Sequence, residues 1–148
     1  MNTDKPWEIE PNYKVWFDKR TGLRCMVKRA HGGHLCGYVR IPRKLRKKIV
    51  RGRRGNFKIH KFDERSLNIP IHGGVSFLGK FKPGGLRKNG YWVGLDCNHH
   101  FDYSPKYPCW GCTPDMYKTW DEVKEYTERL AWKLHLYINS LKRLGKIK

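Results

Sequence analysis

The sequence is poor in acidic residues and has no long hydrophobic run. Only 13 Asp and Glu stand against 32 Lys and Arg among 148 residues, so the formal net charge is +19. No stretch approaches the roughly 18 apolar residues that a membrane span needs, and residues 1–11 lack the apolar core of a secretion signal. The sequence therefore predicts a cytoplasmic protein without a membrane partner. A polyanion such as a nucleotide or nucleic acid is the expected ligand.

Internal repeats and low-complexity tracts are also lacking, and the length predicts one domain over residues 1–148. The five cysteines are odd in number and accompany no export signal. Reduced thiols or metal ligands are therefore expected in place of structural disulfides. The sequence does not indicate an oligomeric state.

Short runs rich in aromatic and β-branched residues, separated by glycine-containing turns, predict β-strands. These runs cover residues 13–17, 23–28, 35–41, 72–79 and 91–97. In the last of them Asp96 and Cys97 should lie on opposite faces, because side chains alternate along a strand. If both serve one site, the strand must end or bulge between them.

The C-terminal part predicts an amphipathic helix over residues 119–144. Thr119 and Glu122 form a capping-box pattern, and apolar residues then recur at helical spacing as far as Leu141. The expected fold is therefore α+β, with a small antiparallel β-sheet covered by this helix.

Residues 40–61 are the most strongly charged part of the chain. They contain eleven Lys or Arg residues and no acidic residue, and Gly52 and Gly55 interrupt any helix. The segment is expected to be a basic loop or hairpin. Either a solvated loop or a contact with a polyanion fits this composition.

Three blocks place histidine, cysteine and aspartate among glycines: His31–Tyr38, His72–Gly74 and Asp96–Asp102. Histidine and aspartate can move protons and stabilise phosphate oxygens, and a cysteine beside histidine can act as a nucleophile. The candidate catalytic residues are His34, His72, His99, Asp96, Asp102, Cys36 and Cys97. For the two cysteines, burial as small apolar side chains is the alternative.

A metal site is a second interpretation of the same residues, with zinc or another divalent metal as cofactor. Cys109 and Cys112 have the spacing of a zinc knuckle, and Cys97 with His99 could complete four ligands. A less regular second set consists of Cys25, His31, His34 and Cys36. Spacing alone does not choose between proton transfer and metal binding.

Ligand contacts outside these groups are expected from three kinds of residue. Glycine backbone at Gly73 and Gly74 lets a phosphate approach, and Tyr38, Trp92 or Trp110 could stack on a base. Arg51, Arg53 and Arg54 could hold phosphate oxygens.

The blocks Gly33–Val39 with Pro42, His72–Ser76 and Trp92–His99 with Asp102, followed by a helix, resemble a family of small phage-encoded proteins. The resemblance covers about residues 23–141. It implies a phage origin and a site at the positions of His34, Cys36, His72, Asp96, Cys97, His99 and Asp102, but no reaction. The basic stretch after Pro42 and the Cys109–Cys112 segment depart from the family pattern.

The favoured hypothesis is a phosphodiesterase-type hydrolase that recognises a nucleotide-type phosphate ligand, such as a cyclic nucleotide signal of host defence. His34, His72 and His99 would share the base, acid and phosphate-binding roles, and the two aspartates would orient them. One alternative is a protein that only sequesters such a signal. Another is a basic, zinc-stabilised accessory protein that binds nucleic acid through residues 40–61.

Overall fold

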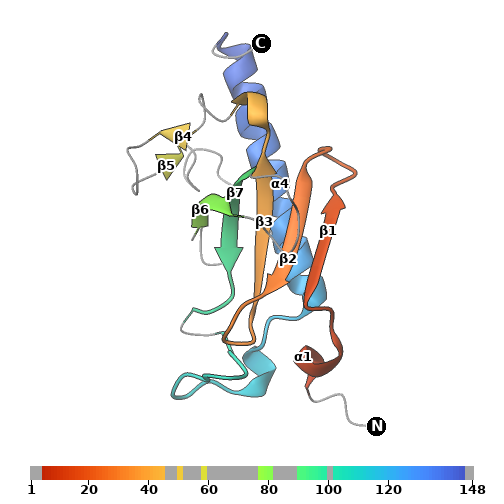
Figure 1. Ribbon diagram of the computed structural model, residues 1–148, viewed down its shortest axis with the longest axis vertical. Helices are drawn as coiled ribbons and strands as arrows, with labels where there is room; N and C mark the ends of the chain where they lie inside the picture. Colours follow the sequence, from red (N-terminus) through yellow and green to blue (C-terminus); the bar gives the residue numbers. More distant parts are fainter. Residues whose placement is uncertain are drawn as a thin grey trace.

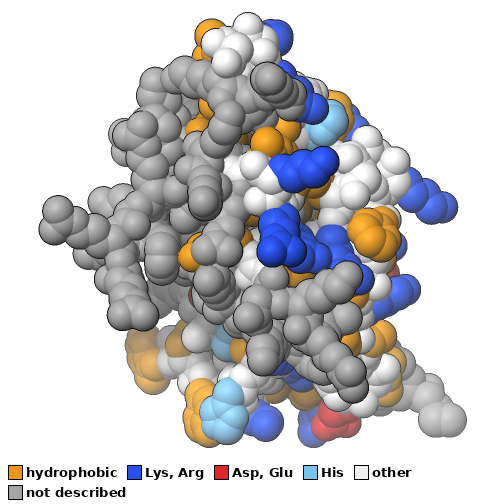
Figure 2. Space-filling model, turned by 45° about the horizontal axis from the view of Figure 1, so that its top comes forward, with side chains coloured by type: hydrophobic (Ala, Val, Ile, Leu, Met, Phe, Trp, Pro, Cys, Tyr) orange, Lys and Arg blue, Asp and Glu red, His pale blue; other side chains and the backbone are white. Residues whose placement is uncertain are grey.

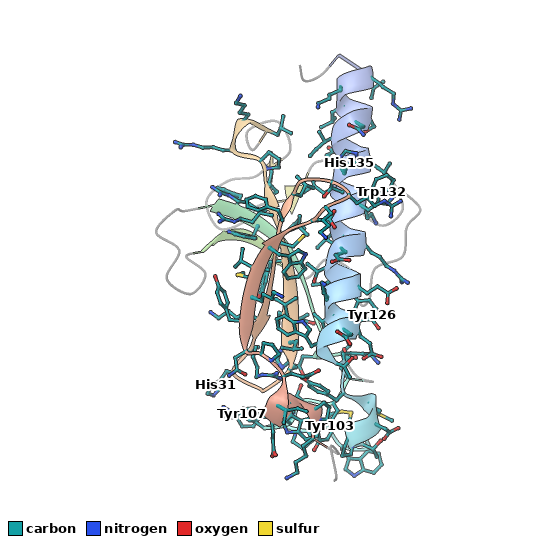
Figure 3. The ribbon with its side chains drawn as sticks, turned by 90° about the vertical axis from the view of Figure 1, so that its right-hand side faces the viewer. His31, Tyr103, Tyr107, Tyr126, Trp132 and His135 are labelled. Atoms are coloured by element: carbon teal, nitrogen blue, oxygen red, sulfur yellow. A yellow bond between two sulfur atoms is a disulfide. The ribbon has the colours of Figure 1, made fainter. Side chains whose placement is uncertain are left out.

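The fold is α+β, with an antiparallel sheet packed against a C-terminal helix, as the sequence predicts. The computed structural model describes residues 5–45, 50–51, 58–59, 77–81, 90–99 and 102–145, with side chains in 5–45, 90–99 and 102–145. Figure 3 shows the two layers from the side, the sheet in one and the helix in the other. None of the described helices is both long and apolar enough to cross a membrane.

The described part of the chain contains three main groups of elements. The five strands of the sheet are β1 (Tyr13–Phe17), β2 (Arg24–Arg29), β3 (Leu35–Ile41), β6 (Phe77–Phe81) and β7 (Gly90–Asp96). The α-helices are α1 (Pro6–Ile9) and α4 (Trp120–Arg143), and the 3-10 turns are η1 (Arg43–Leu45) and η2 (Pro114–Met116). A separate pair is formed by β4 (Val50–Arg51) and β5 (Lys58–Ile59).

The sheet has the order β1-β2-β3-β7-β6, and every neighbouring pair is antiparallel. Figure 1 shows β3 near the middle of the sheet and α4 running lengthwise behind it. The register places Cys36 opposite both Lys28 and Asp96. These three residues therefore share one face, because directly opposed residues project to the same side.

The core lies between the sheet and α4. Strands β2, β3 and β7 present Val27, Val39 and Val93 to the helix, and all three are fully buried. From α4, Leu130 and Leu134 pack into the same cluster. The helix begins with the predicted capping box, in which the Thr119 side chain accepts from the Glu122 backbone N–H and the Glu122 carboxylate accepts from Thr119 N–H.

Two strand glycines allow close packing on opposite faces of the sheet. A side chain at Gly37 would collide with the Thr127 hydroxyl of α4, so glycine lets the helix approach β3. On the other face, the Tyr38 ring lies over Gly94 of β7. The two glycines thus set the distance of the helix and the position of Tyr38.

A part-buried polar cluster joins the N-terminal segment to the start of α4. The Arg29 guanidinium donates to Gly33 O and to the Tyr117 hydroxyl, both at 2.8 Å. The Tyr117 hydroxyl in turn donates to Glu10 Oε1 at 2.8 Å, and Glu10 Oε2 accepts from Trp120 N–H at 2.6 Å. The end of β2, the 30–34 turn and the first turn of α4 are therefore held together.

The predicted strands agree with the described ones to within about one residue for β1, β2, β3 and β7. Of the predicted strand 72–79, residues 77–79 belong to β6, and 72–76 lie outside the described residues. Within the basic segment, Val50 pairs with Ile59 in the β4–β5 ladder. The strand β7 ends at Asp96, so the polar residues that follow it lie in a loop.

The Gly37–Thr127 contact predicts that Gly37→Ala destabilises the protein, by about 1–3 kcal/mol for an overpacked core. The double variant Gly37→Ala with Thr127→Ala should recover part of this loss, because the second change removes the hydroxyl that the new methyl group meets. Urea denaturation of both variants, and of Thr127→Ala alone, measures the coupling. Additive effects would contradict the assigned contact.

Candidate active site

His34 is placed by the tight turn between β2 and β3. Gly33 has a positive φ of 88°, a conformation that favours glycine. Its carbonyl accepts from Arg29, and Ala30 N–H donates to His34 O at 2.8 Å. These contacts fix the backbone on both sides of His34, whose side chain is buried just before β3 begins.

His99 and Asp102 are held together in the loop that follows β7. Asp102 Oδ2 accepts from the His99 backbone N–H at 3.0 Å and lies 2.9 Å from His99 Nδ1. The Asp102 side chain is only 1% exposed, whereas that of His99 is 34% exposed. Lys118 Nζ lies 3.9 Å from the other Asp102 oxygen. The aspartate is thus a buried anchor for a histidine that reaches solvent.

The second nitrogen of His99 faces another carboxylate. His99 Nε2 lies 3.3 Å from Asp96 Oδ1, and Asp96 is partly exposed at the end of β7. Both ring nitrogens of His99 therefore face carboxylate oxygens, Nδ1 that of Asp102 and Nε2 that of Asp96.

Ser104 connects His34 to the same loop. Its hydroxyl donates to Asn98 Oδ1 at 2.6 Å, and its oxygen lies 3.3 Å from His34 Nδ1. With the hydroxyl proton directed to Asn98, the Ser104 oxygen can accept from His34 Nδ1–H. This arrangement assigns the proton of neutral His34 to Nδ1 and the lone pair to Nε2.

The environment of His34 favours its neutral form. Burial lowers the pKa of His34 from its ordinary value of 6.5, and the carboxylates of Asp96 and Asp102 oppose this shift only in part. The charges of Arg29 and His99 lower it further. The site therefore combines a buried histidine whose neutral form is favoured with a second histidine that faces two carboxylates.

The structure opposes a thiolate role for either candidate cysteine. Burial raises the pKa of Cys36 to about 11, and a hydrogen bond with Tyr38 offsets this only in part. Burial also raises the pKa of Cys97, which packs in the core beneath the sheet. As strand alternation predicts, Cys97 and Asp96 lie on opposite faces, and β7 ends between them.

The predicted stacking residues differ in their exposure. Trp92 is 1% exposed and presents no open ring face on which a base could stack. Tyr38 is half-buried over Gly94, and burial raises the pKa of its hydroxyl. Trp110, in contrast, is 97% exposed in the loop before η2. Of the three aromatics proposed from sequence, Tyr38 and Trp110 keep an exposed part.

The predicted metal ligands are not assembled into a site. Cys109 and Cys112 form a disulfide, whereas the sequence predicted reduced thiols or metal ligands. His99 is engaged by Asp96 and Asp102, and Cys97 is buried in the core. Within the described residues, no group of three or more His, Cys, Asp or Glu side chains could hold a metal ion. The second candidate set, which consists of Cys25, His31, His34 and Cys36, is therefore not assembled into a metal site either.

Several predicted ligand and catalytic residues cannot be compared with the structure. His72, Gly73, Gly74, Arg53 and Arg54 lie outside the described residues, and Arg51 is described only by its backbone in β4. The structure does bring together His34, Cys36, Asp96, His99 and Asp102 around the ends of β3 and β7. Ser104 and Asn98 complete this group and were not predicted, although Asn98 lies within the Asp96–Asp102 block.

Comparison with known proteins adds no relative: no protein-family model, no curated protein and no solved structure matches the chain. The geometry and chemistry of the described residues therefore carry the functional argument.

The lowered pKa of His34 predicts a pH-dependent stability. The unfolded chain takes up a proton near pH 6.5 that the folded His34 resists, so stability should fall as the pH drops below about 6.5. His34→Asn, which retains a donor for Ser104, should flatten this decline between pH 7 and 5. Urea denaturation at several pH values checks this. The exposed His31→Asn variant is the control, and an unchanged slope in His34→Asn would contradict the assignment.

Proposed function

We propose that this protein recognises a nucleotide-type phosphate ligand and cleaves a phosphodiester bond in it with His34 and His99. The observation that carries the proposal is the contrast between the two histidines. His34 is buried with a lowered pKa, whereas His99 lies between two carboxylates and reaches solvent. Acid–base catalysis needs such a pair, one group to accept a proton and one to give a proton.

The geometry suggests a role for each group. The Nε2 lone pair of His34 would take a proton from the attacking hydroxyl or water, while Ser104 holds Nδ1–H in place. His99 would give its Nε2 proton to the leaving oxygen. The contact of His99 Nε2 with the exposed Asp96 is the longer of its two contacts with carboxylates, so a ligand oxygen could replace Asp96 there. Asp102 would keep His99 oriented throughout.

Positive charge near the site supports a phosphate ligand. Lys28 lies in the same cross-strand row as Cys36 and Asp96, and Lys118 lies beside Asp102. On the face viewed in Figure 2, adjacent Lys and Arg side chains gather near the centre and add to the positive field of the molecule. Such charge attracts anions and stabilises the negative charge that develops on phosphate oxygens. His72 and the arginines of residues 51–54 are proposed to add to the same ligand site.

The biological setting of the proposal comes from the resemblance to phage-encoded proteins. The ligand would then be a cyclic nucleotide signal of bacterial defence, destroyed in the cytoplasm of the infected host. A hydrolase suits this task because a small amount of enzyme removes many signal molecules.

The test is to incubate the purified protein with cyclic dinucleotides, cyclic trinucleotides and ADP-ribose derivatives, and to analyse the products by mass spectrometry after denaturation. We expect one ligand to be cleaved. His99→Gln should lower turnover by at least about 100-fold, as expected for loss of a general acid, and His34→Asn by a similar factor. Both variants should keep the thermal unfolding temperature within a few degrees.

His135→Gln is the matched control, because this histidine lies on α4 against Trp132 and Asn139. Unchanged turnover in His99→Gln would contradict the assigned acid. Depletion of an intact ligand from the filtrate before denaturation would identify a sequestering protein instead. If every ligand is recovered intact and unbound, cleavage and sequestration of these classes are both wrong.

A further inference from the structure

The first strand forms an open edge of the sheet. Among the described residues, strand β1 pairs with β2 on one side and with no strand on the other. Figure 1 shows it at the border of the sheet, and Figure 3 views the molecule from that side. Asn12 O accepts from Arg29 N–H, and Asp18 N–H donates to Leu23 O, so backbone groups at even positions face β2. Those of Tyr13, Val15 and Phe17 therefore point outward, because the direction alternates along a strand.

The side chains of this edge are unusually apolar for an exposed strand. Phe17 is 64% exposed and Tyr13 is 36% exposed, and both lie on the face away from α4. Lys14 and Trp16 lie on the helix face, opposite Val27 and Cys25 of β2. A flat edge with exposed aromatic side chains is a template for pairing with another strand.

We propose that β1 pairs antiparallel with β1 of a second copy of this chain, with Val15 opposite the partner's Val15. In this register Tyr13 lies opposite the partner's Phe17, and Lys14 opposite the partner's Trp16. The three outward-facing positions would all fall in hydrogen-bonded pairs, which gives about six bonds between the strands. The two sheets would become one continuous sheet with a two-fold axis at Val15.

The side chains match this register on both faces. Two Tyr–Phe pairs would cover the aromatic rings that are exposed in a single copy. On the helix face, each Lys14 ammonium would lie by the partner's Trp16, where a cation–π contact is favourable. Among the registers centred on an outward-facing residue, the one centred on Val15 makes both the Tyr13–Phe17 pairs and the Lys14–Trp16 pairs.

Charges of both signs lie beside the edge, so two copies can offer each other cations and carboxylates. A groove of about 720 Å³ lies between β1 and α4. Its α4 wall carries Lys124 with Glu128 and Glu125 with Arg129, in two i, i+4 ion pairs. The β1 side of the groove is more basic, with Lys14, Lys19 and Arg20 against Asp18. The net charge of +19 opposes association at long range, and salt should therefore strengthen the dimer.

Sedimentation equilibrium of the full chain tests the proposal at protein concentrations from about 1 to 200 μM in 0.1 and 0.5 M NaCl. We expect a monomer–dimer equilibrium that is tighter at the higher salt concentration. Val15→Pro should weaken the dimer at least about ten-fold, because it removes an outward N–H from each copy and no bond to β2. The far-ultraviolet circular dichroism spectrum of this variant should match that of the original protein.

Cross-linking tests the register without relying on the proline variant. In oxidising buffer, Val15→Cys should form a disulfide between copies, because paired Cα atoms lie about 5.5 Å apart. Phe17→Cys is the matched control: its two copies would lie four positions from registry, beyond the reach of a disulfide.

A monomer throughout the concentration range at both salt concentrations would overturn the proposal. Equal cross-linking of the two cysteine variants, or a dimer that a folded Val15→Pro variant leaves unchanged, would also overturn it. None of these results depends on turnover, so the dimer and the proposed hydrolase can fail separately.

Discussion

The part-buried guanidinium of Arg29 is the constraint on which the rest of the structure depends. A charge that loses part of its contact with water needs hydrogen-bond partners in the protein. Arg29 finds them in Gly33 O, the Tyr117 hydroxyl and the Asn12 side chain, with Glu10 at 4.0 Å. One side chain therefore fixes the N-terminal segment, the turn before β3 and the approach to α4.

The contacts of Arg29 also fix the backbone that carries the candidate site. Arg29 holds the residue immediately before His34, and the adjacent Gly32 O accepts from Lys106 N–H at 3.0 Å. That contact joins the 30–34 turn to the loop after β7, where Ser104 meets the His34 ring. The two histidines thus sit on loops that are tied to each other and to the core, which suits a site that must keep proton donor and acceptor in place.

The sequence predicts those features whose signals are local. Runs of aromatic and β-branched residues between turns predicted β1 and β3, alternation separated Asp96 from Cys97, and the capping box located the start of α4. The contact between Ser104 and His34 joins two residues that are 70 positions apart in the sequence. Because both are common residue types, no local pattern predicts this contact. The role of Arg29 is equally hidden among 32 Lys and Arg residues, because only the fold shows which cation meets Gly33 O and the Tyr117 hydroxyl. The Cys109–Cys112 spacing fits either a metal or a disulfide, and the structure contains the disulfide.

The few acidic residues explain why the surface is so basic. Most described carboxylates are engaged locally: Asp18 accepts from Thr21, Glu122 caps α4, Glu10 completes the Arg29 cluster, and Asp96 with Asp102 hold His99. These carboxylates cap turns and orient neighbouring side chains. They are too few to neutralise the 32 Lys and Arg residues, so the positive field persists at long range. A phosphate that approaches the site therefore meets a field in which attraction dominates, and the two aspartates act on His99 more than on the ligand. The same field opposes a second copy of the chain, so the proposed nucleotide binding and the proposed pairing through β1 should respond to salt in opposite directions.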